Sequence, residues 1–211
     1  MDVYIWSDVA CPWCYIGKRS FEQALEAFRG RDEVTVHWRS FELDPGAPAR
    51  REGTLESLLM AKYQLSEAQV AATQARITET AANLGLEYHL DQVQVGSTFD
   101  AHRLIHLAAE VGLGGEMKER LLRAYFTEGA LVSDHPTLTR LATEVGLDPE
   151  AVAELLAGDA FAEAVRADEA LAQRNQFSAV PTFVVDGRYA VTGAQDPAVL
   201  LELLERAAAE A

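Results

Sequence analysis

The chain has 211 residues, of which 49% are hydrophobic, so it is long enough for one large domain or two small ones around a packed core. Thirty-three acidic residues against 18 Lys and Arg give a net charge of −15, which argues against nucleic acid or an anionic membrane surface as a partner. No apolar run approaches the roughly 18 residues that span a bilayer. Asp2 stands where a secretion signal would carry a basic residue, so we expect a cytoplasmic protein.

A strand, a helix and a second strand open the chain. Residues 2–7 are expected to be a strand around the apolar run Val3–Trp6, and a helix-like pattern begins at residue 12. Residues 34–39 alternate apolar and polar side chains as a half-buried strand does. These segments predict a βαβ unit with parallel strands. A stretch rich in proline and glycine at residues 45–48 marks the exit from this unit.

Nearly everything between residues 50 and 173 is predicted to be helical, because apolar residues recur at the spacing of a helix face. One such stripe consists of Leu138, Leu141, Ala142 and Val145. Three of the helices end in the same way, at Gly85-Leu86, Gly112-Leu113 and Gly146-Leu147. Glycine suits the left-handed conformation just past a helix end, and the following leucine can pack back on the last turn.

The chain closes with a β-hairpin and a helix. Thr182–Val185 and Arg188–Val191 flank Asp186-Gly187, which is a strong signal for a two-residue turn. The apolar face of the final helix is formed by Leu200, Leu203 and Leu204. We expect the hairpin and this helix to complete the N-terminal sheet, giving an α/β fold with the helical block inserted between its two halves.

Cys11-Pro12-Trp13-Cys14 contains the only two cysteines of the chain. A disulfide this short would constrain the unfolded chain little, so the pair indicates redox chemistry and not a structural bridge. With Cys11 at the helix N-cap, Pro12 fits the first helical position, and the next two N–H groups would point toward the Cys11 sulfur. These groups and the helix dipole predict a lowered pKa for Cys11, which makes it the attacking sulfur. Cys14, less exposed in the first turn, would resolve the mixed disulfide, and Trp13 is predicted to be exposed.

The same cysteine spacing occurs in half of a zinc site, which needs two further ligands. His102 and His106, at i and i+4, could complete such a set. We expect no metal, because each histidine is typical of a surface or boundary position. The spacing is also compatible with a pair of unreactive thiols and with a non-catalytic module that holds a metal.

Pro181 opens a predicted strand, a position that proline tolerates, and most bonds before proline are trans. The motifs elsewhere in the chain give this proline a further meaning. A Cys-Pro-X-Cys turn, an inserted helical block and Val180-Pro181-Thr182 before a hairpin together resemble the thioredoxin superfamily, and the block narrows the resemblance to the DsbA family. Further motifs resemble its FrnE-like branch of cytoplasmic proteins: residues 11–18 (CPWCYIGK), 41–45 (FELDP), 101–104 (AHRL), 124–126 (AYF) and 193–195 (GAQ).

The resemblance implies a thioredoxin-like fold with a large all-helical insertion between an N-terminal βαβ unit and a C-terminal ββα unit. The thioredoxin-like domain would comprise residues 1–46 and 174–211, and the helical insertion domain residues 47–173. The implied activity is that of a thiol–disulfide oxidoreductase acting on a disulfide-containing protein or a small thiol. It would need no cofactor beyond its redox-active disulfide, with glutathione as an external thiol.

The resemblance also implies roles for residues around the cysteines. Pro181 would be cis and packed against Cys11, leaving the Val180 backbone to pair with an extended substrate chain, and Pro12 and Trp13 would line the substrate site. Glu42 is either a proton acceptor during resolution or a solvent-facing or capping residue. In the His102-Arg103 motif, Arg103 either orients the insert through a salt bridge or lines the substrate cleft.

Two departures from the family pattern are informative. Ala179 precedes Val180, where members often have glycine, and this chain has no second cysteine pair. The alternative function is that of a glutathione-dependent isomerase or transferase of the kappa-class or hydroxychromene-carboxylate isomerase type. Those proteins typically use serine in place of the first cysteine, so the presence of both Cys11 and Cys14 favours redox chemistry. The sequence is equally compatible with an oxidase, a reductase and a disulfide isomerase.

Overall fold

The computed structural model describes residues 1–210. Its four-stranded sheet consists of β1 (Asp2–Ser7), β2 (Thr35–Ser40), β3 (Thr182–Val185) and β4 (Tyr189–Thr192) in the order β2-β1-β3-β4. β1 runs parallel to β2 and antiparallel to β3, and β3 and β4 form an antiparallel hairpin. The predicted α/β fold and the parallel pairing of the first two strands are confirmed.

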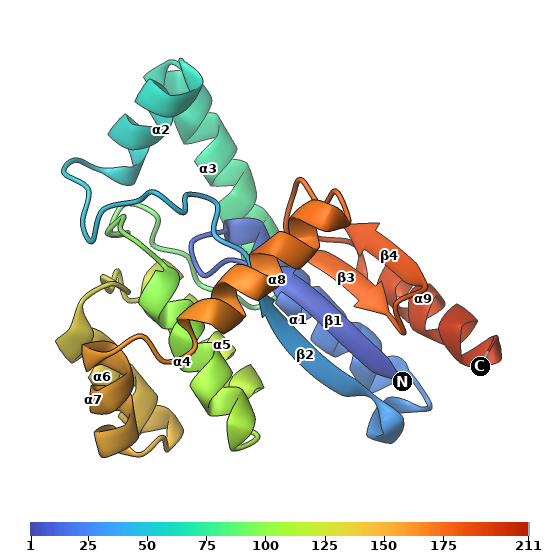
Figure 1. The fold of residues 1–211 in the computed structure, drawn as a ribbon. Coiled ribbons are helices and arrows are strands. Elements are labelled where there is room, and N and C mark those ends of the chain that lie inside the picture. Colours follow the sequence, from blue (N-terminus) through green and yellow to red (C-terminus); the bar gives the residue numbers. More distant parts are fainter. Residues whose placement is uncertain (211) are drawn as a thin grey trace.

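Helices connect the strands of this sheet and follow its last strand (Figure 1). Their bounds are α1 Pro12–Ala27, the 3₁₀ turn Arg31–Glu33, α2 Leu55–Tyr63, α3 Glu67–Ala82, α4 Phe99–Glu110, α5 Gly114–Phe126, α6 His135–Val145, α7 Pro149–Ala157, α8 Ala162–Arg174 and α9 Pro197–Ala209. We call α2 to α8, which lie between β2 and β3, the helical insert, and the remaining elements the sheet part. The domain boundaries after residues 46 and 173 stay a prediction, and the second falls one residue before α8 ends.

One face of the sheet is covered by α1 and α9, which lie behind the strands in Figure 1. Ile5 of β1 and Phe183 of β3 are buried there against Phe21 of α1 and Leu204 of α9. The Phe21 and Phe183 rings stack with centroids 5.7 Å apart. Burying a large apolar side chain is worth about 1.5–3 kcal/mol, so this layer anchors α1 and the cysteines at its start.

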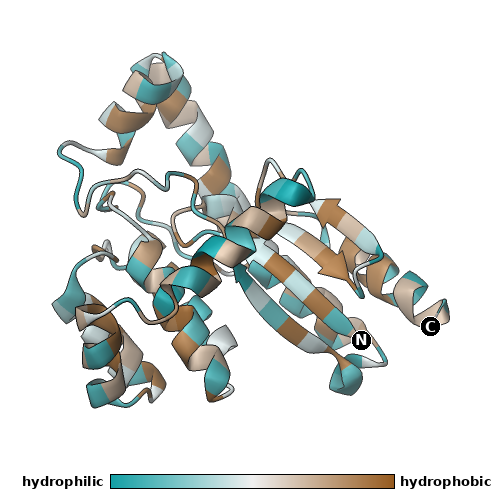
Figure 2. Ribbon diagram, in the orientation of Figure 1, coloured by the Kyte–Doolittle hydropathy of each residue, from teal (hydrophilic) through white to brown (hydrophobic). Residues whose placement is uncertain are grey.

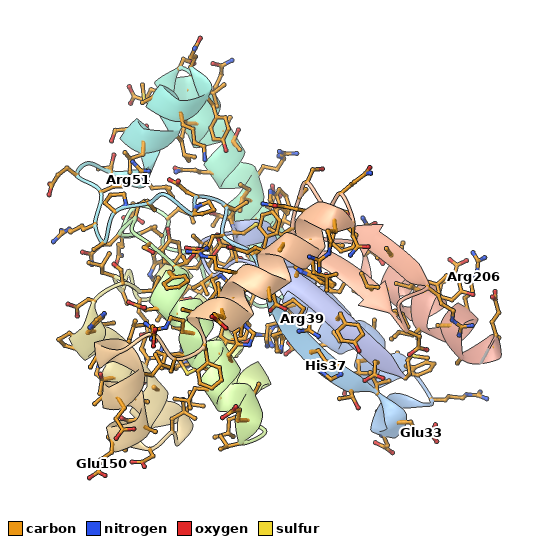
Figure 3. All side chains as sticks on the ribbon, in the orientation of Figure 1. Glu33, His37, Arg39, Arg51, Glu150 and Arg206 are labelled. Atoms are coloured by element: carbon orange, nitrogen blue, oxygen red, sulfur yellow. The ribbon has the colours of Figure 1, made fainter. Side chains whose placement is uncertain are left out.

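The opposite face of the sheet is crossed by α8. The Trp6 indole donates to the Asp168 carbonyl at 3.0 Å, and Val184 packs in the same cluster as Ala172. Arg39, labelled on β2 in Figure 3, binds the Asp168 carboxylate at 2.9 Å. These contacts fix the last helix of the insert to the sheet beside the cysteines.

A second apolar core, to which α4, α5, α6 and α7 contribute fully buried residues, lies mostly in the insert and also contains Tyr15 and Ile16 of α1. Its α2–α3 hairpin projects away from the rest of the molecule (Figure 1), and α2 has no buried residue. In Figure 2, hydrophilic and hydrophobic residues are mixed both over this hairpin and along the first two strands of the sheet. No helix within residues 1–210 is both long and apolar enough to cross a bilayer.

The predicted capping of three helices is confirmed. Gly85, Gly112 and Gly146 have φ values of 75°, 78° and 104°, in the left-handed region. The following leucine N–H groups close the caps: Leu86 bonds Ala81 O at 3.0 Å, Leu113 bonds Ala108 O at 2.8 Å and Leu147 bonds Ala142 O at 3.0 Å. This is the hydrogen-bond pattern of helices that end at a left-handed glycine.

Two local predictions are wrong. Residues 83–98 are irregular and not helical, because their backbone groups bond to distant segments: His89 N donates to Phe126 O at 2.7 Å, and Val95 O accepts from Arg51 N at 2.8 Å. The hairpin turn has three residues and not two, since Val185 pairs with Tyr189 and leaves Arg188 in the turn. Arg188 N donates to Val185 O at 3.0 Å, which closes this longer turn.

Candidate active site

The two cysteines lie at the N-terminus of α1. Cys11 is the N-cap residue with extended backbone angles, and Pro12 occupies the first helical position, as predicted. Both sulfurs are free thiols. Cys11 is 5% exposed and Cys14 is 1% exposed, so Cys11 is the more accessible sulfur of the pair.

The expected capping of the Cys11 sulfur by helix N–H groups does not occur. The Cys11 side chain accepts no cap hydrogen bond, and Cys14 N donates to the Cys11 carbonyl at 3.0 Å. The Cys11 thiol instead donates to the Val180 carbonyl at 3.6 Å. A contact across 169 residues of sequence therefore joins the first cysteine to the segment before β3.

The Val180–Pro181 peptide bond is cis, and Pro181 packs on the first turns of α1. Gly17 makes this contact possible, because a Cβ atom at residue 17 would lie 2.6 Å from Pro181 Cγ. That distance is far inside ordinary carbon–carbon contact. The glycine of α1 thus sets how closely Val180 and Pro181 approach the cysteine pair.

The two thiols share a hydrogen bond, so the ionisation of each depends on the other. The pKa of Cys11 lies well above its ordinary value because of its hydrogen bond with Cys14 and because of burial. Burial alone would raise the pKa of Cys14, but the hydrogen bond with Cys11 and the positive charge of Lys118 lower it. The low pKa predicted for Cys11 from the helix N-terminus is thus opposed by the hydrogen bond with Cys14 and by burial.

A buried carboxylate and a buried amine stand next to the pair. Asp8, 1% exposed, accepts from Leu43 N at 2.8 Å and from His102 Nε2 at 3.2 Å. Burial would raise the pKa of Asp8, but the His102 bond holds it below its usual value. Lys118 of α5 donates from Nζ to Ser7 O at 3.0 Å, and burial lowers its pKa to about 8.

The sequence reasoning missed Asp8 and Lys118. Lys118 carries a detectable signal, because it lies on the apolar stripe of α5 that contains Leu121 and Leu122 three and four residues later. A charged residue on a buried helix face needs a partner. Asp8 carries a weaker signal, as the polar residue between an apolar strand and the cysteine motif.

The residues between the cysteines are only partly accessible. Trp13 is half-buried against the core of the insert, and the Arg76 guanidinium lies 5.9 Å from its ring centroid. The prediction of an exposed Trp13 is therefore wrong, because Arg76 of α3 in the insert packs against its ring. Tyr88 Oη donates to the Pro12 carbonyl at 2.7 Å, which ties the irregular segment 83–98 to the cysteine turn.

Glu42 is buried, so a solvent-facing position is wrong. Its Oε2 binds Arg166 of α8 at 2.6 Å, and its Oε1 has no hydrogen-bond partner within the described residues. Burial raises the pKa of Glu42 to about 7 despite the Arg166 charge. Its role as a proton acceptor stays a prediction.

Arg103 does not line a cleft. It is buried inside the insert and donates to Ala160 O at 2.8 Å and Gly158 O at 2.7 Å, with further bonds to Leu155 O and to the Asp100 carboxylate. It therefore joins α4 to the end of α7. This agrees with the alternative that it orients the insert.

The histidines of the same helix are bonded to other groups. His102 contacts Asp8, while His106 Nε2 lies 3.1 Å from Ser40 Oγ and 3.3 Å from the Asp168 carboxylate. Within residues 1–210, no three or more His, Cys, Asp or Glu side chains are grouped as metal ligands would be.

Comparison with known proteins identifies the group to which this arrangement is similar. Residues 2–205 match the model of the DSBA-like thioredoxin domain. A solved structure of a probable DsbA oxidoreductase from Streptomyces coelicolor is 44% identical, with a TM-score of 0.96 over 100% of this chain and 91% of that one. The uncharacterized protein YwbO of Bacillus subtilis (strain 168) is 31% identical over 185 residues, covering 87% of this chain and 86% of that protein.

Two more distant solved structures share the fold alone. A 2-hydroxychromene-2-carboxylate isomerase is 14% identical with a TM-score of 0.71, over 100% of this chain and 95% of that one. The cytosolic disulfide reductase DsbM from Pseudomonas aeruginosa is 20% identical with a TM-score of 0.66, over the full length of both chains.

Proposed function

The chain belongs to the family of DSBA-like thioredoxin domains, and on that premise we propose that it is a thiol–disulfide oxidoreductase in which Cys11 exchanges with substrate and Cys14 resolves the mixed disulfide. The observation that carries this proposal is the placement of the free pair at the start of α1. Cys11 is the more exposed sulfur and contacts Val180, while Cys14 lies behind it. Incoming sulfur therefore meets Cys11 first.

In the oxidising direction the pair reacts in two displacements, and in the reducing direction the same steps run backward, with Cys14 resolving the mixed disulfide by attack on the Cys11 sulfur. A substrate thiolate attacks the Cys11 sulfur of the Cys11–Cys14 disulfide, the bond between the two cysteines breaks, and Cys14 leaves as a thiolate. A second substrate thiolate then attacks the substrate sulfur of the mixed disulfide. The substrate disulfide forms, Cys11 leaves with the electron pair and takes up a proton, and the protein is left in its dithiol form.

The net direction of exchange depends on the relative stability of the dithiol and disulfide forms of the pair. A glutathione redox titration with quantified thiols measures it: a reduction potential near about −120 mV would indicate an oxidase, and one near about −270 mV a reductase.

Val180 and Pro181 supply the substrate clamp in this proposal. The Val180 carbonyl already accepts a bond from the Cys11 thiol, so an extended substrate chain that adds to this segment brings its sulfur to Cys11. Pro12 and Trp13 border the same site. A FrnE-like relationship and a cytoplasmic location belong to this proposal, and glutathione serves as its small thiol, since DsbM has been solved with GSH.

Trapping the mixed disulfide tests the roles of the two sulfurs. Reduced Cys14→Ser protein mixed with glutathione disulfide should accumulate one glutathione adduct on Cys11, seen by mass spectrometry of the intact protein. Cys11→Ser protein should acquire its adduct at least about tenfold more slowly, because Cys14 is the more buried sulfur. Faster labelling of Cys14 would reverse the assignment.

The same proteins separate oxidoreductase from isomerase. Wild-type protein that consumes substrate thiols while Cys11 and Cys14 become reduced is an oxidoreductase. Glutathione-dependent rearrangement of a substrate with no change in the number of thiols, retained in Cys11→Ser, would favour the isomerase alternative.

A further inference from the structure

The backbone between the two cysteines is held by a phenol of the helical insert. Tyr88, in the irregular segment between α3 and α4, donates from Oη to the Pro12 carbonyl at 2.7 Å. The next residue, Trp13, packs against the core of the insert, and the Arg76 guanidinium lies 5.9 Å from its ring centroid. Both residues that separate the two sulfurs are therefore in contact with groups from the insert.

The Tyr88 hydroxyl is a fixed point because its ring is buried in an aromatic cluster. The residue is 6% exposed, and its ring stacks on Phe126 of α5 with centroids 4.8 Å apart and on Tyr15 of α1 with centroids 6.0 Å apart. The neighbouring backbone is anchored as well, since His89 N donates to Phe126 O at 2.7 Å. Because the ring is already immobilised, its bond to the cysteine turn costs little further side-chain entropy.

Resolution of a mixed disulfide makes strict demands on this turn. A disulfide forms only when the two sulfurs come to about 2.05 Å from each other with their Cα atoms about 4.4–6.8 Å apart. The backbone of Pro12 and Trp13 sets that approach, whereas the first exchange at Cys11 depends on how the incoming substrate reaches it. A group that fixes the Pro12 carbonyl therefore acts on the second step and not on the first.

We propose that Tyr88 is a positioning residue for the resolving step of the exchange. The inference rests on the proposed function. In this step the Cys14 thiol releases its proton to water and the thiolate attacks the Cys11 sulfur of the mixed disulfide. The bond between Cys11 and the substrate sulfur breaks, and the substrate leaves as a thiolate with the electron pair. By holding the Pro12 carbonyl, Tyr88 keeps the two cysteines at the spacing from which their bond forms, and so shortens the lifetime of the mixed disulfide.

Tyr88→Phe removes the hydroxyl and keeps the ring in the cluster. Reduced protein mixed with excess glutathione disulfide should form the adduct on Cys11 at the wild-type rate. The adduct should then decay to the intramolecular disulfide about fivefold more slowly, which is the factor that one ordinary hydrogen bond contributes. Intact-protein mass spectrometry of acid-quenched samples gives both rates. In a Cys14→Ser background, where resolution cannot occur, Tyr88→Phe should change the rate of adduct formation by less than about twofold.

Tyr15→Phe is the matched control. It removes a phenol of the same aromatic cluster whose hydrogen bond has the same length, 2.7 Å, but whose acceptor is Glu119 of α5. Its mixed disulfide should be resolved within about twofold of the wild-type rate. Equal slowing in the two variants would mean that the cluster matters and not the bond to Pro12, and it would overturn the proposal. A folded Tyr88→Phe protein that resolves at the control rate would overturn it too.

A protein with Tyr88 in place gives independent evidence if Tyr88→Phe fails to fold. Cys14→Ser protein that carries glutathione on Cys11 represents the mixed disulfide from which resolution starts. Its crystal structure should keep Tyr88 Oη within hydrogen-bond distance of Pro12 O, and a broken bond there would overturn the proposal. A wild type that forms neither the adduct nor the intramolecular disulfide would instead refute the proposed function, whatever the position of Tyr88.

Discussion

The sheet part and the helical insert contribute to the site in different ways. In the proposed reaction, the sheet part supplies both reacting sulfurs at the start of α1 and the Val180–Pro181 segment before β3. The insert supplies no cysteine, but its α4 and α5 place His102 and Lys118 against the end of β1. Short motifs therefore encode the reacting groups, whereas single polar residues on otherwise apolar helix faces encode their electrostatic surroundings.

Removing the hydrogen bond that His102 of α4 makes to Asp8 should have the largest effect on stability. Burial lowers the pKa of His102, so a neutral imidazole holds the buried Asp8 carboxylate, and His102→Ala should lower the free energy of unfolding by about 3 kcal/mol. Because the pKa of Asp8 is lowered in the folded protein, its stabilising contribution is present above the unfolded pKa of about 3.9 and is lost as the pH falls below it. Urea denaturation near neutral pH measures the loss.

His135→Ala is the control for this prediction. His135 makes the same type of contact, to Asp100 at 3.0 Å, but on the exposed surface of the insert. Its removal should cost less than about 1 kcal/mol. Equal losses in the two variants would show that the insert does not stabilise the site through a buried charge.

Overpacking the sheet part at Gly17 should have the next largest effect. Gly17→Ala places a methyl group 2.6 Å from Pro181 Cγ, so Pro181 must move, and we expect a net cost of about 1–3 kcal/mol even though alanine favours helix. Adduct formation at Cys11 should slow as well, because the shift moves Val180. Gly46→Ala, where the nearest group is Asp44 Oδ1 at 3.8 Å, is the control. A Gly17→Ala protein as stable as the control would mean that α1 does not set the position of Pro181.

Glu42 gives the smallest effect, and one that depends on pH. The folded pKa of about 7 lies above the ordinary value of 4.5, so wild-type stability should decrease as the pH rises through this interval. Glu42→Gln does not ionise, and between about pH 5 and about pH 8 it should gain about 2 kcal/mol relative to wild type. Urea denaturation at the two pH values measures this difference.

The exposed Glu150 of α7, labelled in Figure 3, provides the control. Glu150→Gln should stay within about 0.5 kcal/mol of wild type at both pH values. If the stability of Glu42→Gln protein changes with pH in the same way as that of wild type, the Glu42 carboxylate is in contact with water and not buried.

Local chemistry made much of the fold predictable from the sequence. The left-handed glycines 85, 112 and 146, the N-cap position of Cys11 and the parallel βαβ unit all depend on residues close together in the chain. The irregular path of residues 83–98 was not predictable in this way. Its backbone hydrogen bonds end on Arg51 and Phe126, and nothing within the segment indicates those partners.

The site, too, was predictable where it depends on residues close together in the chain and not where it depends on distant ones. The cysteine motif is visible in the sequence, and a cation near it is not, because Lys118 lies more than 100 residues away in the chain. The prediction of a low pKa for Cys11 considered only the helix N-terminus, whereas Cys14 and burial act on the same sulfur in the opposite direction. The environments of Arg103 and Trp13 were not predictable either, because both depend on the insert. Arg103 is buried between α4 and the end of α7, and Trp13 is half-covered by α3.

The contact between Cys11 and Val180 joins residues 169 positions apart, and this separation has a consequence for biosynthesis. A chain growing from its N-terminus presents both cysteines to its surroundings long before β3 exists to pair with β1. Until then, Cys11 lacks the Val180 carbonyl that holds its thiol, and β1 has one unpaired edge. A ribosome-bound chain that ends before Thr182 should therefore alkylate at Cys11 as an ordinary free thiol, and the site should become selective only when the last two strands have joined the sheet.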